Sequence, residues 1–172
     1  PMIASSSDDA RSRFLQEAKA SARVNHPNII DIFDVGETED NALFLVMELL
    51  EGLSLQDAMR SEPPFSVREL LIVLAGAAMA LGAAHAAGII HRDVKPPNIF
   101  LARDRNTAFV RTKLLDFGVS KVAIDNDGIA THTGSMLGSP RYMAPEQAVN
   151  ASQADGRADL WSLGVILFEG IT

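Results

Sequence analysis

Apolar residues recur at helical spacing near the start of the chain. Phe14, Ala18 and Ala22 lie four residues apart, and this period predicts a helix over residues 8–24. Glu17 lies at the edge of the apolar stripe. There it either forms an exposed pair with a cation one turn away, worth a few tenths of a kcal/mol, or has a functional partner elsewhere.

The longest apolar stretch, residues 70–84, carries no charged side chain. Ser66 precedes it and Gly88 follows it, so it predicts a helix from residue 66 to about residue 87 that stops at the glycine. A membrane span needs roughly 20 apolar residues, which is more than this stretch supplies. We therefore expect a buried helix of the core.

Shorter apolar runs separated by polar turns predict strands. Residues 29–35 and 43–48 are expected to form one hairpin through a polar turn at 37–41. Residues 99–101 and 110–115 flank a second polar turn. Residues 52–55 are expected to begin a short helix.

Composition limits the class of protein. At 172 residues and 47% hydrophobic, the chain is expected to form one domain, or most of one, with its own core. Its formal net charge of −7 argues against a nucleic-acid or anionic-membrane partner. It has no cysteine, which argues against a disulfide framework or a thiolate zinc site. No signal-peptide pattern opens it, and we expect a cytoplasmic location.

Candidate chemistry concentrates in residues 91–101. Pro96 and Pro97 cannot continue a helix, so Asp93, Lys95 and Asn98 are expected to meet in a tight loop at the mouth of the strand that follows. A carboxylate can accept a hydroxyl proton, an ammonium group can neutralise a phosphoryl oxygen, and an amide oxygen can bind Mg²⁺. The alternative is a capped turn with ordinary surface charges.

Three motifs follow one another along the chain. H-R-D-x-K-x-x-N spans residues 91–98, D-F-G spans 116–118 and A-P-E spans 144–146. In this order they resemble the signature of protein kinases, most closely the bacterial serine/threonine kinases of the eukaryotic (Hanks) type. The resemblance implies an α+β, two-lobed kinase fold, truncated to the part from helix αC to helix αF, with αF at residues 155–168.

The resemblance also divides the chain. Residues 1–47 would form part of the small lobe, 48–52 the hinge, and 53–172 part of the large lobe with an activation segment at 116–146. Nothing like G-x-G-x-x-G precedes Glu17, and the lysine of the family's third strand is absent. We therefore expect this chain by itself to transfer phosphate poorly and to expose apolar surface at both ends.

The catalytic roles follow from the resemblance. Asp93 would orient the acceptor hydroxyl and take its proton, and Lys95 would neutralise the moving phosphoryl group. Asn98 and Asp116 would bind Mg²⁺, which bridges phosphate oxygens of ATP. Glu17 would be the acid of αC that pairs with the absent lysine. The expected cofactors are ATP and Mg²⁺, and the expected partner is a protein with a Ser or Thr acceptor.

Nucleotide binding is expected between the lobes. Met47 would be the gatekeeper, and the backbone from Glu48 to Leu50 would bind the adenine edge. A lysine two residues after Asp93 resembles the serine/threonine branch rather than the tyrosine branch. A homodimer of kinase domains is a further expectation, with no nucleic acid and no membrane contact within this segment, although a segment outside it could tether the whole protein to a membrane.

Other residues are expected to be structural or regulatory. His91 and Phe117 would pack in the spine that links the lobes. Arg92 would receive a phosphorylated activation loop, for which Thr131 and Thr133 are the candidates; the alternative is that these are solvated threonines.

A second group would organise the substrate side. Ser139 would contact the catalytic aspartate and lysine, and Asp159 would hydrogen-bond to the catalytic-loop backbone. Glu146 would pair with an arginine later in the domain, and Gly118 completes the D-F-G motif.

Two other functions stay open. One is a pseudokinase or scaffold that binds without catalysis, which the missing lysine would support and the presence of Asp93, Asn98 and Asp116 opposes. The other is a small-molecule phosphotransferase of the aminoglycoside-kinase kind. Those enzymes resemble protein kinases but generally lack the D-F-G and A-P-E segment.

Overall fold

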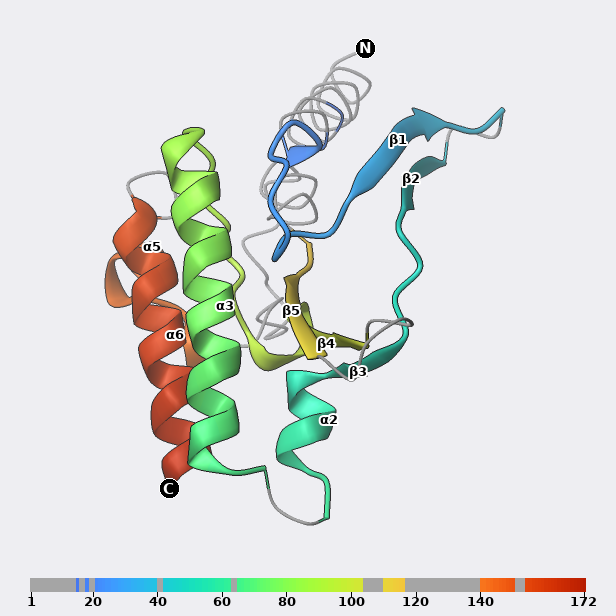
Figure 1. Ribbon diagram of the computed structural model, residues 1–172. Helices are drawn as coiled ribbons and strands as arrows, with labels where there is room; N and C mark the ends of the chain where they lie inside the picture. The colour runs from blue at the N-terminus through green and yellow to red at the C-terminus, as the bar shows by residue number, and fades with distance from the viewer. Residues whose placement is uncertain are drawn as a thin grey trace.

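The computed structural model describes residues 15, 18, 21–39, 42–62, 65–103, 110–116, 140–150 and 154–172. A two-stranded hairpin, a three-stranded sheet and a pair of long helices make up its main parts (Figure 1). In the hairpin, β1 (Ile32–Glu37) pairs antiparallel with β2 (Leu43–Met47). The register shifts between Ile32 and Asp34, where a β-bulge leaves Phe33 exposed.

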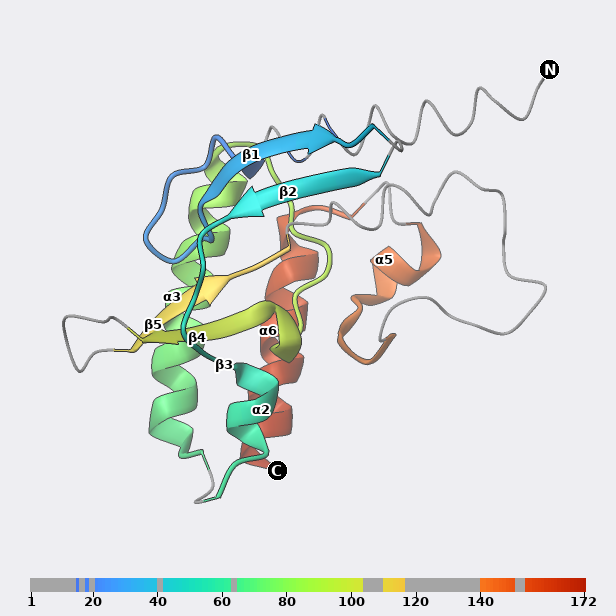
Figure 2. The same cartoon turned by 90° about the vertical axis from the view of Figure 1, so that its right-hand side faces the viewer.

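The second sheet has the order β3–β4–β5, with both strand pairs antiparallel. Its strands are β3 (Gly52–Ser54), β4 (Ile99–Arg103) and β5 (Val110–Leu114). Helix α2 (Leu55–Met59) follows β3 directly, and Ser54 caps it by accepting the Asp57 N–H at 3.1 Å. The segment before β1 joins the free edge of β5, where Ile30 N donates to Leu114 O at 3.1 Å. This contact ties the hairpin to the sheet. Figure 2 shows the hairpin above β4 and β5.

Helix α3 (Val67–Ala86) begins and ends as its sequence requires. Ser66 and Glu69 form a reciprocal capping box. At the other end Gly88 takes φ +77°, and Ile89 N donates to Ala84 O at 2.9 Å, which closes a Schellman motif. The expected start at Ser66 and stop at Gly88 are confirmed.

Helix α6 (Gly156–Ile171) packs antiparallel against α3 (Figure 1). Asp155 caps it by accepting the Arg157 N–H at 2.9 Å. The core lies between this helix pair, α2 and the three-stranded sheet. Its largest fully buried apolar side chains come from segments far apart in the sequence: Ile29, Leu55, Leu70, Leu81, Val94, Ile99, Leu114 and Ile166.

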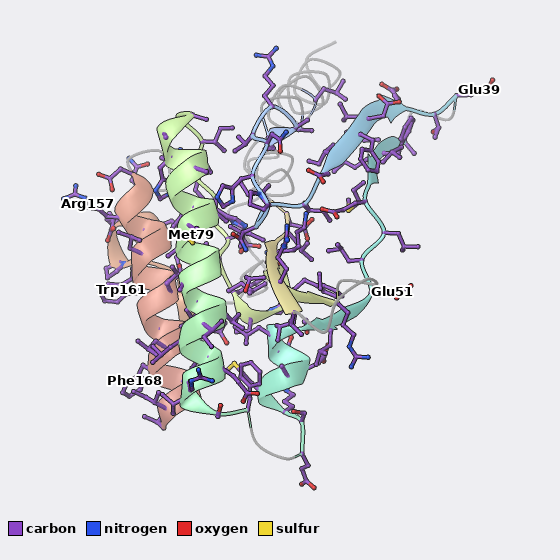
Figure 3. All side chains as sticks on the ribbon, viewed as in Figure 1. Glu39, Glu51, Met79, Arg157, Trp161 and Phe168 are labelled. Carbon is purple, nitrogen blue, oxygen red and sulfur yellow. The ribbon has the colours of Figure 1, made fainter. Side chains whose placement is uncertain are left out.

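The long helices are buried on one face only. Among the described helices, α3 alone is long and apolar enough to cross a membrane, but 39% of that window is buried inside the protein. Its other face exposes Leu71, Ile72 and Met79. On α6, Trp161 and Phe168 project from the side away from the sheet (Figure 3). The expected core helix is confirmed on the inner face of α3, whose buried residues belong to the main core, while its outer face stays exposed.

Several predicted boundaries also change. Residues 52–54 form a strand on the edge of β4 instead of opening the helix, because a strand partner is available there. The first strand begins at Ile32, since Ile29 and Ile30 contact β5 instead. Ala18 and Ser21 are buried, whereas Ala22 is exposed in the turn that follows Ser21, so Ala22 does not continue the predicted apolar stripe. The rest of the helix predicted over residues 8–24 lies largely outside the described residues.

Three short helices are the other elements described. The short helices η1 (Pro96–Asn98) and η2 (Pro140–Tyr142) begin with proline, as does α5 (Pro145–Val149). Proline suits the first turn because its missing N–H would have no partner there. The only α-helix among these three, α5, starts at the A-P-E motif.

Candidate phosphotransfer site

Three polar side chains meet in the loop before β4, as the sequence predicts. Lys95 Nζ lies 2.8 Å from Asp93 Oδ2, and Asn98 Nδ2 lies 3.2 Å from the same oxygen. Asn98 also donates to the Asp93 carbonyl at 2.9 Å. Asn98 is buried, while the side chains of Asp93 and Lys95 keep 12% and 24% of their exposure. The site is thus buried on its inner side, at Asn98, and partly exposed at the acid and the lysine.

His91 joins this loop to the strand that leads into D-F-G. Its ring is fully buried, with Nε2 at 2.8 Å from Leu115 O and Nδ1 accepting the Asp93 N–H at 3.3 Å. These partners require a neutral ring with the proton on Nε2. Burial holds the pKa of His91 below its ordinary value, against the opposing charge of Asp159. His91 therefore packs, as expected, and also orients the backbone of the catalytic loop.

Asp159, on the first turn of α6, binds the backbone of the catalytic loop. Its Oδ2 accepts His91 N at 3.0 Å and its Oδ1 accepts Arg92 N at 2.8 Å, as the resemblance implied. His85 adds a third contact from α3, with Nε2 at 2.7 Å from Oδ2. Asp159 is 1% exposed, and a buried carboxylate needs such partners.

The backbone at Arg92 is held in the left-handed region, with φ +62°. This conformation is unfavourable for a residue with a Cβ. The carbonyl of Arg92 accepts Gln147 Nε2 from α5 at 2.6 Å, while its N–H is bound by Asp159. The loop therefore keeps a strained geometry because two separate helices bind the same residue.

Asp116 lies next to the Asn98 side of the loop. Leu115 N donates to Asn98 O at 2.9 Å, and Asp116, the next residue, is exposed with φ +50°. The side-chain nitrogen of Asn98 donates to Asp93. The side-chain oxygen of Asn98 is therefore the atom that can bind a cation. One carboxylate and one amide oxygen suit Mg²⁺, which completes its shell with water and phosphate oxygens. No larger group of His, Asp or Glu that could hold a metal occurs among the described residues.

The hinge contains an ion pair that sequence reasoning missed. Lys113 on β5 is buried and bonds the Glu48 carboxylate, while its Nζ also donates to Ile29 O at 3.0 Å. The Asp31 N–H donates to the same Glu48 oxygen at 2.9 Å. Besides the backbone role predicted for residues 48–50, the Glu48 side chain joins the hinge to β5. A lysine within an apolar run was the available signal.

Tyr142 was also missed. Its hydroxyl donates to Glu169 Oε2 at 2.6 Å, and its carbonyl accepts Ser162 Oγ at 2.7 Å. Burial, with the Glu169 hydrogen bond second, raises the pKa of Tyr142 to about 12, so the hydroxyl stays a donor. Asp159, Ser162, Ile166 and Glu169 are three or four residues apart, and this spacing places them on one face of α6.

The remaining predicted residues separate into two groups. Met47 lies at the end of β2 and is 39% exposed, Leu50 lies between β2 and β3, and Glu146 is exposed in the first turn of α5. The second group lies outside the described residues: Glu17, Phe117, Gly118, Thr131, Thr133 and Ser139. For both groups the roles remain predictions.

Comparison with known proteins agrees with this geometry. The protein kinase domain family matches residues 2–172. Serine/threonine-protein kinase pkn3 of Myxococcus xanthus is 44% identical over 163 residues, which cover 93% of this chain and 29% of that protein. Serine/threonine-protein kinase PknB of Mycobacterium tuberculosis is 38% identical, with 93% and 25% covered. The chain thus spans less than a third of the length of these curated relatives.

A solved structure shows the same fold. The crystal structure of a double mutant of the Mycobacterium tuberculosis PknI kinase domain superposes with a TM-score of 0.71 at 32% identity. It covers 95% of this chain and 57% of the solved one. The likeness of sequence, fold and loop geometry gives one conclusion: the chain belongs to the protein kinase domain family, among relatives that are bacterial serine/threonine kinases.

Proposed function

We propose that the protein carrying this chain transfers the γ-phosphate of ATP to serine or threonine hydroxyls of other proteins. The observation that carries this proposal is the convergence of Lys95 and Asn98 on one oxygen of Asp93. Asp116 follows the backbone contact between Leu115 and Asn98. A general base, a cation and two oxygen ligands therefore lie within one loop and the strand end beside it.

Each group has a role in the transfer. The hydroxyl oxygen bonds to the γ-phosphorus while the bond from phosphorus to the bridging oxygen breaks, and ADP leaves with that electron pair. Asp93 accepts the hydroxyl proton, and Lys95 neutralises charge on the transferred group. The tether from Asp159 to the backbone keeps Asp93 at one position during this step.

The family uses ATP with a divalent metal, and Asn98 and Asp116 are the residues proposed to hold Mg²⁺. When bound, the ion supplies positive charge to the phosphate oxygens. The hinge backbone at residues 48–50 is proposed to bind adenine, next to Met47. The division into residues 1–47, 48–52 and 53–172 and a cytoplasmic location remain part of the proposal.

The test is Mg-ATP-dependent labelling of a Ser/Thr peptide by the protein as its cell produces it. Asp93→Asn should lower the rate by about 10²–10⁴-fold, the usual contribution of a general base. Asp34→Asn, at an exposed aspartate of β1, is the matched control and should keep the parent rate.

Two outcomes would contradict the proposal. Labelling that survives Asp93→Asn in a folded variant would remove Asp93 from the chemistry. ATP binding without any labelling would favour the pseudokinase instead.

A further inference from the structure

A recess of about 380 Å³ lies beside the hinge, and none of its described lining residues belongs to the catalytic loop. Residues 48–51 of the hinge form one wall, Asp31 before β1 forms the second, and β4 and β5 form the third. Ligand sites commonly have volumes of about 300–1,000 Å³. The recess is therefore large enough for a ligand and separate from the proposed phosphotransfer site.

Hydrogen bonds hold the three walls together. Glu48 N donates to Asp31 O at 2.9 Å, and Asp31 N donates to the Glu48 carboxylate at 2.9 Å. Arg103 N donates to Glu51 O at 2.7 Å and joins β4 to the hinge. The Lys113 ammonium group bonds the same Glu48 carboxylate from β5. The recess is thus preformed, and a ligand does not have to order its walls.

The carboxylates of the lining already have partners. Glu48 bonds Lys113, and Asp31 Oδ2 lies 3.9 Å from the same ammonium nitrogen. Glu51 also has an interaction partner. A cationic ligand would therefore have to compete for each of these acids.

Two arginines of the recess differ from these acids. Arg103 and Arg111 are both exposed, and neither guanidinium group forms an ion pair with a residue that the structure describes. Arg103 lies opposite Val110 and Arg111 opposite Ala102, so the two arginines belong to neighbouring pairs of one strand ladder. Guanidinium groups bind carboxylates through paired hydrogen bonds. The recess therefore favours a carboxylate as its ligand.

Exposed apolar side chains flank the arginines. Leu49 of the hinge lines the recess and is 88% exposed, and Val110, opposite Arg103, is 54% exposed. The centre of a protein–protein interface combines apolar side chains with arginine. An inorganic anion would contact the arginines alone, whereas a peptide with an acidic and an apolar side chain contacts both kinds of group. The chemistry of the recess therefore suits a peptide.

We propose that this recess is a docking site for an acidic segment of a partner protein. The segment places an aspartate or glutamate on Arg103 and Arg111 and an apolar side chain on Leu49. The docking site extends the proposed function without depending on it, because it lies outside the residues that would carry out phosphate transfer.

The experiment selects peptides that use the arginines. A phage library of random short peptides is selected on the protein as its cell produces it. Dissociation constants of the recovered peptides are then measured by fluorescence anisotropy for the parent and for Arg111→Glu. We expect peptides with a carboxylate next to an apolar residue, bound about tenfold more weakly by the variant. Their affinity should fall as the salt concentration rises.

Two further variants serve as controls. Arg68→Glu makes the same charge change at an exposed residue of α3 outside the recess, and it should bind the peptides as the parent does. Arg111→Gln removes the charge without reversing it, and it should weaken binding less than Arg111→Glu does. Thermal unfolding of each variant shows whether it is folded.

Three results would overturn the docking site. The recovered peptides could bind the parent and Arg111→Glu equally, or those that distinguish the two could lack acidic residues. Displacement of the peptides by Mg-ATP would assign the recess to the nucleotide site instead. Because binding is measured without phosphate transfer, failure of the docking site and failure of the kinase function are distinguishable.

Discussion

Asp159 binds the backbone of Arg92 across 67 residues of sequence, with its Oδ1 at 2.8 Å from the Arg92 nitrogen. Arg92 has φ +62°, which costs free energy for a residue with a side chain. The hydrogen bond offsets that cost, and the next residue along the chain is Asp93. The first turn of α6 therefore determines where the proposed general base lies.

Replacing Asp159 should destabilise the whole protein. Asp159→Asn exchanges one acceptor oxygen for an NH₂ group, which then faces the N–H donors of the loop. Loss of a buried, charge-assisted network costs roughly 3 kcal/mol in the free energy of unfolding. Urea denaturation measures it. Asp155→Asn on the same helix is the control, because asparagine caps a helix as well as aspartate does; equal effects of the two variants would contradict the role of Asp159.

Two glycines of α3 should respond oppositely to alanine. A Cβ at Gly76 would lie 2.8 Å from Thr112 Cβ on β5, whereas a Cβ at Gly82 meets nothing within 4 Å. Gly76→Ala should therefore lower the free energy of unfolding by about 1–3 kcal/mol through overpacking. Gly82→Ala should raise it by about 0.5–1 kcal/mol, because alanine is the better helix former. Thermal unfolding of both variants measures these effects. A stabilising Gly76→Ala would contradict the prediction and show that β5 can move away from α3.

The neutral state of His91 makes stability depend on pH. Its pKa is lowered in the folded protein from the ordinary value of 6.5, so the unfolded chain binds more protons between the two values. The free energy of unfolding should fall as the pH decreases below about 6.5. Above that pH His91 is neutral in both states, so its titration should no longer change the stability. His91→Phe removes the titration. Urea denaturation of parent and variant at pH 7.5 and 5.5 should give a smaller pH effect in the variant, and equal effects would refute the assignment.

The pair of Lys113 and Glu48 should act as a unit. Lys113→Met leaves the Glu48 carboxylate without its buried cation, which should cost about 3 kcal/mol in the free energy of unfolding. The double variant Lys113→Met with Glu48→Gln should cost less than the sum of the single variants, since neither charge is then left behind. A double-mutant cycle by urea denaturation measures this coupling. Strict additivity would mean that the two side chains act independently.

The order of residues alone predicts much of the local structure of this protein. The loop from His91 to Asn98 could be predicted because two prolines force a turn and place three polar side chains within six residues. The ends of α3 were readable for a similar reason, since the capping box and the glycine stop act within one turn of the chain.

Contacts between distant segments could not be read in this way from residue patterns. Lys113 looks like a surface charge until β5 brings it to Glu48, and Tyr142 has no visible partner until α6 presents Glu169. Residues 52–54 form a strand because they pair with β4. Local sequence determined the turns, caps and chemistry of each segment because those forces act over a few residues. Tertiary structure decided which buried charges meet and which helix faces stay exposed, because desolvation depends on neighbours that only packing supplies.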